Sequence, residues 1–207
     1  MHGACDTLSL VAIFIVSLMI EITDLQCVRN EQILFQKISF ILNPGEVLQV
    51  FGPNGIGKST LLRAIAARQI PGSFCYIGHK HNLHPALTVA ENLRFLQVLL
   101  PNITNQTDSS LCAALKYFCM QRFYHKPSYE LSAGELQRIS LTRLRLTTAK
   151  LWLLDEPVAN LDVAAQQLFI NLCEQHLLNG GIIICATHIT FEFMAANSTT
   201  IRLQEYA

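Results

Sequence analysis

The chain has 207 residues, of which 51% are hydrophobic and 14% charged, and its 15 basic and 15 acidic side chains give a formal net charge of zero. This length and apolar content exclude a disordered chain and allow one domain with a sizeable buried core. The balanced charge excludes a strongly basic nucleic-acid-binding surface, so no nucleic-acid partner is expected.

The chain begins with a short apolar run at residues 8–20. This run has the length of a signal-peptide core but is too short to span a bilayer. No Lys or Arg precedes it and no small-residue cleavage site follows it. We therefore interpret residues 1–18 as a non-native extension and residues 19–207 as the folded domain; the alternative is a short hydrophobic anchor.

After this run, strand-like and helix-like segments alternate along the chain. Alternation of this kind predicts an α/β fold with a parallel sheet covered on both faces. Residues 79–130 read instead as helices joined by polar loops, which predicts a helical subdomain. The predicted strands are residues 19–23, 46–51, 74–77, 151–154 and 182–186, and the predicted helices are residues 59–68, 88–100, 109–120, 162–178 and one that starts at Ser132.

A glycine-rich loop follows the strand at residues 46–51. Its sequence, GPNGIGKST, matches the phosphate-binding pattern G-x-x-x-x-G-K-[ST] between a strand and a helix. Glycines let the backbone approach a phosphate closely, and the N–H groups at the start of the helix attract an anion. Lys58 is expected to reach the β- and γ-phosphates of ATP, and Ser59 to bind Mg²⁺. The predicted ATP-binding residues are Gly52, Pro53, Asn54, Gly55, Ile56, Gly57, Lys58, Ser59 and Thr60.

Two later strands end in residues that suit phosphate chemistry. The apolar strand at residues 151–154 is followed by Asp155 and Glu156, and the strand at residues 182–186 leads to His188. Ligands of parallel α/β sheets bind at the carboxyl ends of the strands. We expect Asp155 to hold Mg²⁺ through water, Glu156 to polarise the attacking water, and His188 to hydrogen-bond the γ-phosphate.

A helix start lies in LSAGE, residues 131–135. Ser132 followed three residues later by Glu135 is a capping box, in which each side chain bonds the other residue's backbone N–H. The residues alone do not distinguish a capped helix from one that also contributes to a binding site.

The order of these motifs, with Ala159-Asn160-Leu161-Asp162 after the second acid, resembles that of the ATP-binding subunits of ABC transporters over residues 20–207. The resemblance implies a P-loop NTPase of the ABC ATPase type, with a mixed sheet flanked by helices, that hydrolyses ATP with Mg²⁺. It also implies a homodimer in which the signature helix of one subunit faces the ATP of the other, with Ser132 and Gly134 on the γ-phosphate. The signature residues that act in trans would be Leu131, Ser132, Ala133, Gly134 and Glu135.

A narrower resemblance is carried by residues 25–63, by YIGHK and by LTVAENLRF. These segments are similar to the ATP-binding proteins of cytochrome c maturation, the haem exporter ATPases. The resemblance implies haem as an indirect cargo, a separate integral membrane permease, and a peripheral location on the cytoplasmic side of the bacterial inner membrane. The alternatives are an ABC ATPase for another cargo, such as lipid or lipoprotein release, and a soluble non-transport ABC ATPase.

Two positions depart from the general family pattern. Arg29 replaces the aromatic residue that stacks on adenine, and either stacking by its guanidinium or a solvated position is compatible with the sequence. His79 stands where a glutamine usually completes the Mg²⁺ shell, which leaves metal binding by this residue open. His79, His81 and His84 lack a carboxylate or cysteine between them, so we interpret them as part of a solvated loop rather than a metal site.

Overall fold

The computed structural model describes residues 19–29, 32–68, 74–100, 102–103, 107–194 and 196–206. The expectation for residues 1–18 lies outside this described part of the chain.

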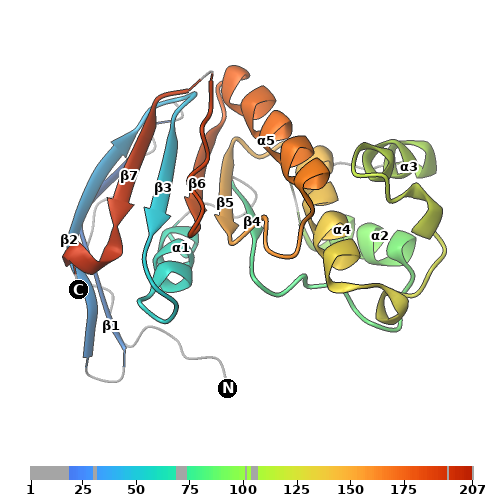
Figure 1. Cartoon of the computed structure of the whole chain (residues 1–207), viewed down its shortest axis with the longest axis horizontal. Coiled ribbons are helices and arrows are strands. Elements are labelled where there is room, and N and C mark those ends of the chain that lie inside the picture. Colours follow the sequence, from blue (N-terminus) through green and yellow to red (C-terminus); the bar gives the residue numbers. More distant parts are fainter. Residues whose placement is uncertain are drawn as a thin grey trace.

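A five-stranded parallel sheet forms the centre of the molecule, with strand order β4-β5-β6-β3-β7 (Figure 1). Four of these strands were predicted, and β4 and β6 have the expected bounds. β7 was not predicted, because only one of its residues is buried and its sequence carries little apolar signal. The strands are β3 (Val47–Phe51), β4 (Phe74–Ile77), β5 (Leu151–Asp155), β6 (Ile182–Ala186) and β7 (Ser198–Arg202).

A second sheet consists of two antiparallel strands, β1 (Ile20–Arg29) and β2 (Gln32–Leu42). The edge strand expected at residues 19–23 is therefore the start of a longer strand. β1 and β2 bury apolar side chains such as Leu25, Phe35 and Ile38, which belong to the core cluster that also contains residues of α1 (Lys58–Ala66).

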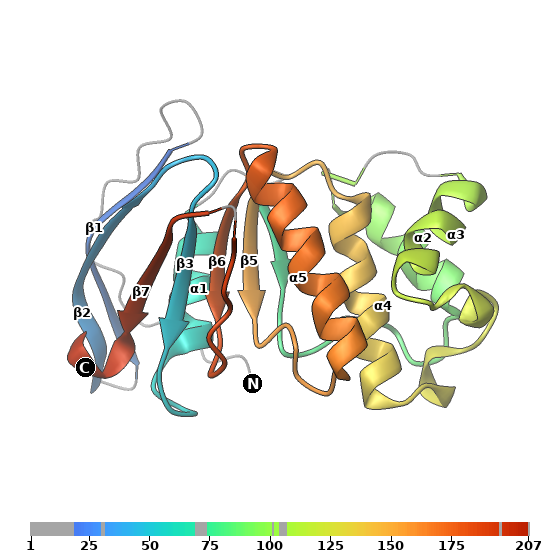
Figure 2. The same cartoon turned by 45° about the horizontal axis from the view of Figure 1, so that its top comes forward.

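Both faces of the parallel sheet are covered, as predicted. Along β5, Leu151 and Leu153 join the core on the α1 side, whereas Trp152 and Leu154 join the larger core on the other side. That larger core includes residues of α4 (Ala133–Leu146) and α5 (Val163–Leu178). Figure 2 shows α5 in front of the sheet and α1 behind it. Side chains that alternate along a strand point to opposite faces, so a strand covered on both faces is apolar throughout.

The predicted helical segment lies beside the sheet, at the end where β4 forms the edge (Figures 1 and 2). It contains α2 (Val89–Leu99), α3 (Asp108–Tyr117) and two short 3-10 helices, η1 (Gln121–Phe123) and η2 (Ser128–Glu130). α3 ends before the expected Met120 because Cys119 adopts a left-handed backbone conformation, with φ of 58°. A last 3-10 helix, η3 (Leu203–Tyr206), follows β7. Among the described residues, no helix combines the length and the apolar character needed to cross a bilayer.

Candidate functional site

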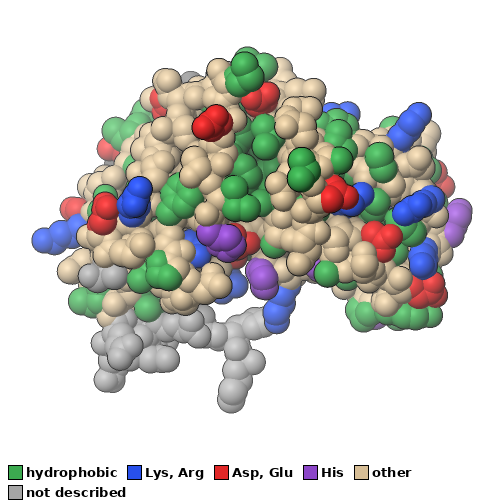
Figure 3. Space-filling view, in the orientation of Figure 1, with side chains coloured by type: hydrophobic (Ala, Val, Ile, Leu, Met, Phe, Trp, Pro, Cys, Tyr) green, Lys and Arg blue, Asp and Glu red, His purple; other side chains and the backbone are tan. Residues whose placement is uncertain are grey.

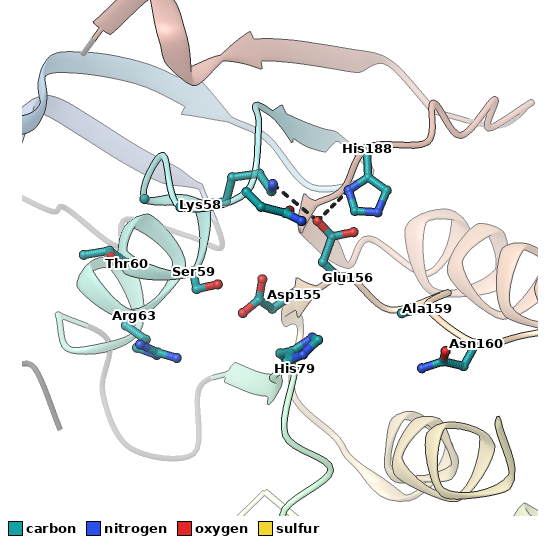
Figure 4. Close-up of a pocket in the computed structure, with 13 residues that line it drawn as sticks. Lys58, Ser59, Thr60, Arg63, His79, Asp155, Glu156, Ala159, Asn160 and His188 are labelled. Atoms are coloured by element: carbon teal, nitrogen blue, oxygen red, sulfur yellow. Dashed lines mark ion pairs between the residues drawn. The ribbon is translucent and has the colours of Figure 1, made fainter. Parts of the chain in front are cut away.

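A cavity of about 600 Å³ lies at the carboxyl ends of the central strands, where the sequence predicted a nucleotide site. In the space-filling view, histidine, acidic and basic side chains gather where the lower edge of the molecule is hollowed (Figure 3). Figure 4 shows the residues that line the cavity, which come from the loop after β3, from α1 and from the ends of β4, β5 and β6. They are Asn54, Gly55, Gly57, Lys58, Ser59, Thr60, Arg63, His79, Asp155, Glu156, Ala159, Asn160 and His188.

The phosphate loop joins β3 to α1. Gly57 is the N-cap of α1 and has φ of 112°, a backbone conformation that residues other than glycine rarely adopt. Among the residues that the structure describes, no side chain caps this helix end. Four backbone N–H groups at a helix start lack partners within the helix, and the helix dipole makes that end positive. The start of α1 therefore offers backbone donors to an anion in the cavity.

Lys58 is a buried cation at the cavity wall, with only 6% of its surface exposed. Its Nζ donates hydrogen bonds to Gly52 O at 2.7 Å and to Pro53 O at 3.4 Å. It also forms an ion pair with Glu156 Oε1 at 3.4 Å. These contacts hold the ammonium group within the loop, beside the N–H groups at the start of α1. Gly52 and Pro53 themselves do not line the cavity, and neither does Ile56.

Glu156 and His188 contact each other beside Lys58. His188 Nδ1 lies 3.0 Å from Glu156 Oε1, so this carboxylate oxygen lies between a lysine and a histidine (Figure 4). Glu156 follows β5 directly and has φ of 52°, which is uncommon for a residue other than glycine. Its backbone N–H donates to Ala186 O at 2.9 Å, which ties the turn to β6. The unusual backbone geometry places the carboxylate beside the phosphate loop.

Asp155 and Ser59 are residues of this cavity whose oxygens could hold a metal ion. Asp155 is 1% exposed, and within the described part of the chain its side chain accepts a hydrogen bond at Oδ2 from the Tyr76 hydroxyl, at 3.4 Å. In Figure 4, Ser59 and Asp155 point toward one another. Carboxylate and hydroxyl oxygens suit Mg²⁺, which usually takes few protein ligands and completes its shell with phosphates and water. The residues present therefore fit Mg²⁺.

Of the histidines in the loop after β4, one lines the cavity and another lies outside it. His79 lines the cavity near Asp155 (Figure 4), whereas His81 is partly buried outside the lining. Burial, and secondarily the neighbouring His79, lower the pKa of His81. Within the described residues, no three His, Cys, Asp or Glu side chains are arranged to hold a metal ion together. Whether His79 contributes to a metal shell stays a prediction.

The signature residues lie outside the cavity lining. Ser132 is the N-cap of α4, and the expected capping box is present: Glu135 N donates to Ser132 Oγ at 3.3 Å, and Ser132 N donates to Glu135 Oε2 at 2.9 Å. The Ser132 side chain is exposed. Thus the helix start is capped and also reachable by a second molecule, which leaves its role in trans as a prediction.

α4 is fixed to the loop that follows Glu156. Gln137 Nε2 donates to Pro157 O at 2.6 Å, and Arg138 forms an ion pair with Asp162. Gly134 lies against the same loop, because an added Cβ would stand 2.7 Å from Asn160 O. The glycine of the signature is therefore needed for close packing within this chain.

The sequence analysis missed three residues of the cavity, and one residue that it predicted has a side chain that the structure does not describe. Arg63 lies one helical turn after Ser59, so the period of α1 would have placed it on the same face. Ala159 and Asn160 belong to a motif that supported the family resemblance but was not assigned to the site. The side chain of Arg29, at the end of β1, lies outside the described part of the chain, so stacking on adenine stays a prediction.

Comparisons with known proteins agree with this geometry. The ABC transporter family matches residues 35–73 and 67–159. The protein named cytochrome c biogenesis ATP-binding export protein CcmA from Ruegeria sp. (strain TM1040) is 39% identical, with 83% of this chain and 85% of the relative covered. Its namesake from Rhizobium meliloti (strain 1021) is 38% identical, with coverage of 82% and 91%.

Solved structures have the same fold. An ATP-binding subunit of an ABC transporter superposes with a TM-score of 0.71 at 24% identity, covering 84% of this chain and 80% of its own. The ADP conformation of MJ1267, an ATP-binding cassette of an ABC transporter, gives a TM-score of 0.65 at 18% identity, with coverage of 84% and 82%. The family match over more than half of the chain, and relatives at 38% and 39% identity over more than four fifths of it, show that the chain belongs to the ATP-binding family of ABC transporters.

Proposed function

We propose that this chain is the ATP-hydrolysing subunit of a membrane complex that exports haem during cytochrome c maturation. Family membership supports the ATPase activity, and relatives named cytochrome c biogenesis ATP-binding export protein support the process. The observation that carries the proposal is the position of Glu156 Oε1, 3.4 Å from Lys58 Nζ and 3.0 Å from His188 Nδ1. This arrangement supports a role for Glu156 as a base beside Lys58, the proposed phosphate-binding cation, at the end of the sheet.

Binding of the triphosphate follows from the phosphate loop. The N–H groups at the start of α1 and the Lys58 ammonium group supply positive potential to the β- and γ-phosphates. Ser59 and Asp155 would hold Mg²⁺, which neutralises charge on the phosphate oxygens when it is bound. Since Lys58 contacts both Gly52 O and Glu156, phosphate oxygens would compete with these acceptors for its three N–H donors.

Hydrolysis then depends on Glu156. A phosphate that takes over the Lys58 contact releases the Glu156 carboxylate, which accepts a hydrogen bond from the attacking water and orients it in line with the γ-phosphate. His188 is on the other side of the same carboxylate and is exposed toward the cavity. Its imidazole would donate to the γ-phosphate, so its contacts change when that phosphate leaves.

A second copy of the chain would complete the site. The signature residues of one subunit, residues 131–135, lie outside their own cavity and start a helix whose positive end is exposed. In the proposed homodimer, the hydroxyl of Ser132 of the partner subunit donates a hydrogen bond to the γ-phosphate. The backbone N–H of Gly134 of the partner subunit donates a second one. Each ATP is then held by two subunits.

The proposed membrane partner is a separate permease. α2 exposes Phe95, Val98 and Leu99, with exposed fractions of 53%, 84% and 56%. An apolar helix face of this kind suits docking against a helix of another protein. The chain would then act peripherally at the cytoplasmic side of the bacterial inner membrane, and haem would be bound by the membrane subunits rather than by this chain.

The test is ATP-dependent dimerisation of Glu156→Gln. This change keeps the size of the side chain but removes the base, so hydrolysis should fall by about 100-fold or more and the ATP-bound dimer should persist. Sedimentation velocity with and without ATP measures the dimer, and Glu174→Gln on α5 is the matched control. A Glu156→Gln variant that remains monomeric at saturating ATP would contradict the shared site.

The cargo needs a separate measurement in the membrane. Co-expression with the permease should yield a complex in which ATP hydrolysis depends on Lys58 and in which the Soret absorption of haem is detected. A complex that carries lipid or lipoprotein instead would support the alternative cargo. A chain that associates with no membrane protein would favour a non-transport ATPase.

A further inference from the structure

Tyr76 lies in β4, next to the strand that carries the candidate metal ligand. Its hydroxyl donates a hydrogen bond to Asp155 Oδ2 at 3.4 Å. Within the described part of the chain, no second side-chain hydrogen bond to Asp155 is present, although its side chain is 1% exposed. A carboxylate that has lost most of its water needs a fixed donor to define its orientation. Tyr76 supplies that donor from behind the cavity, whose lining does not include it.

The direction of this hydrogen bond follows from the chemistry of the two groups. A carboxylate has no proton to donate, whereas a phenol keeps its proton at neutral pH. The Tyr76 hydroxyl is therefore the donor and Asp155 Oδ2 is the acceptor.

The position of the Tyr76 ring is fixed at two further points. Gly78 leaves room for the ring, because an added Cβ would lie 2.8 Å from Tyr76 Cε1. The backbone carbonyl of Tyr76 accepts a hydrogen bond of 3.1 Å from Arg143, a residue of α4 that is 4% exposed. The hydroxyl is thus placed by a packed ring, a strand and a buried arginine rather than by a mobile side chain.

From this arrangement we infer that Tyr76 is a positioning residue that holds Asp155 in the orientation that binds Mg²⁺ together with ATP. The inference rests on the proposed ATPase site and adds a residue that contacts neither the nucleotide nor the metal. Hydrogen-bond partners of metal ligands commonly contribute about 10- to 100-fold to metal affinity. Since the bond between Tyr76 and Asp155 is long, the expected contribution is near the lower limit, about tenfold.

Tyr76→Phe tests this role, because it removes the hydroxyl and keeps the ring in the core. The dissociation constant of a fluorescent ATP analogue is measured with excess EDTA and with saturating Mg²⁺. The constant in EDTA divided by the constant in Mg²⁺ reports how strongly metal binding and nucleotide binding are coupled. In Tyr76→Phe this ratio should fall by about tenfold, with the constant in EDTA unchanged. Electron paramagnetic resonance of Mn²⁺ bound with the analogue should show a matching loss of metal affinity.

Tyr117→Phe is the matched control, since it removes a hydroxyl that donates to Leu168 O at 3.0 Å and does not line the cavity. It should keep the wild-type ratio. If wild type responds to Mg²⁺ and Tyr76→Phe responds equally, the inference is overturned. Equal weakening of binding in EDTA and in Mg²⁺ overturns it too, because the hydroxyl would then support only the fold. Failure of wild type to bind the analogue in either condition would instead count against the proposed function.

Discussion

Acidification is expected to destabilise this protein through His176, a partly buried imidazole near the end of α5. Its ring stacks on Trp152 with the ring centroids 3.7 Å apart, and its Nε2 lies 2.9 Å from Lys150 O. A carbonyl oxygen only accepts, so Nε2 carries the proton of the neutral ring. Gly181 lies against the imidazole, since an added Cβ at this position would clash with the ring. Burial is the largest cause that lowers the pKa of His176 from 6.5 to about 4.

The sign of the effect follows from the two pKa values. Because the pKa is lower in the folded protein, the unfolded chain takes up a proton first as the pH falls. The contribution of His176 to stability is thus fully present above pH 6.5 and is lost as the pH falls toward 4. Linkage with these values gives a loss of about 2 kcal/mol in the free energy of unfolding by about pH 5, and of about 3 kcal/mol below about pH 4.

Urea denaturation at a series of pH values measures this loss. The chain contains a single tryptophan, and it is the residue that stacks on His176, so its fluorescence reports unfolding at this position. His176→Gln keeps an amide donor but does not titrate. Between about pH 7 and pH 5, its free energy of unfolding should fall by about 2 kcal/mol less than that of wild type. His84→Gln, which removes an exposed imidazole, is the control. Equal pH dependence in wild type and His176→Gln would refute the reasoning.

Two further predictions concern the nucleotide site. Lys58→Ala removes charged hydrogen bonds to phosphate and should weaken ATP binding by about 10- to 100-fold, measured by calorimetric titration; unchanged affinity would contradict the role given to this lysine. Gly134→Ala brings a Cβ to 2.7 Å from Asn160 O, so the loop after β5 must shift, with a cost of about 1–3 kcal/mol in thermal or chemical unfolding. ATP turnover should fall with it, and a variant with wild-type stability and turnover would show that this contact relaxes freely.

The sequence predicted those parts of the fold that depend on local signals. β4, and the strand and helix on either side of the glycine-rich loop, were predicted correctly because a buried apolar run and three closely spaced glycines are recognised from neighbouring residues. β2 and β7 were missed for a different reason. Lys37 in β2 has φ of 58°, which interrupts the alternation that identifies a strand, and β7 is a strand only because it pairs with β3.

The difference between local signals and tertiary contacts also holds for the candidate site. The sequence predicted Lys58, Asp155, Glu156 and His188, which line the cavity, because each stands at a recognisable strand end or loop. Tyr76 was not found, because its importance depends on a contact with a residue 79 positions later in the chain. A tyrosine in a buried strand has the same local pattern whether or not its hydroxyl meets a metal ligand, so only the tertiary structure distinguishes the two cases.

The contacts of α4 connect residues 131–135 to the loop that begins at Glu156, the proposed base, within one subunit. Gly134, Gln137 and Arg138 all contact the loop between Glu156 and α5, through close packing, a hydrogen bond of 2.6 Å and an ion pair. A displacement of the start of α4 by a second subunit therefore cannot occur without moving this loop or breaking a buried contact, because packed interfaces have few alternative arrangements. Since Glu156 begins that loop, in the proposed homodimer the position of Glu156 in one site would depend on how the start of α4 meets the other site. This gives a physical route by which two ATP sites in a homodimer would affect one another.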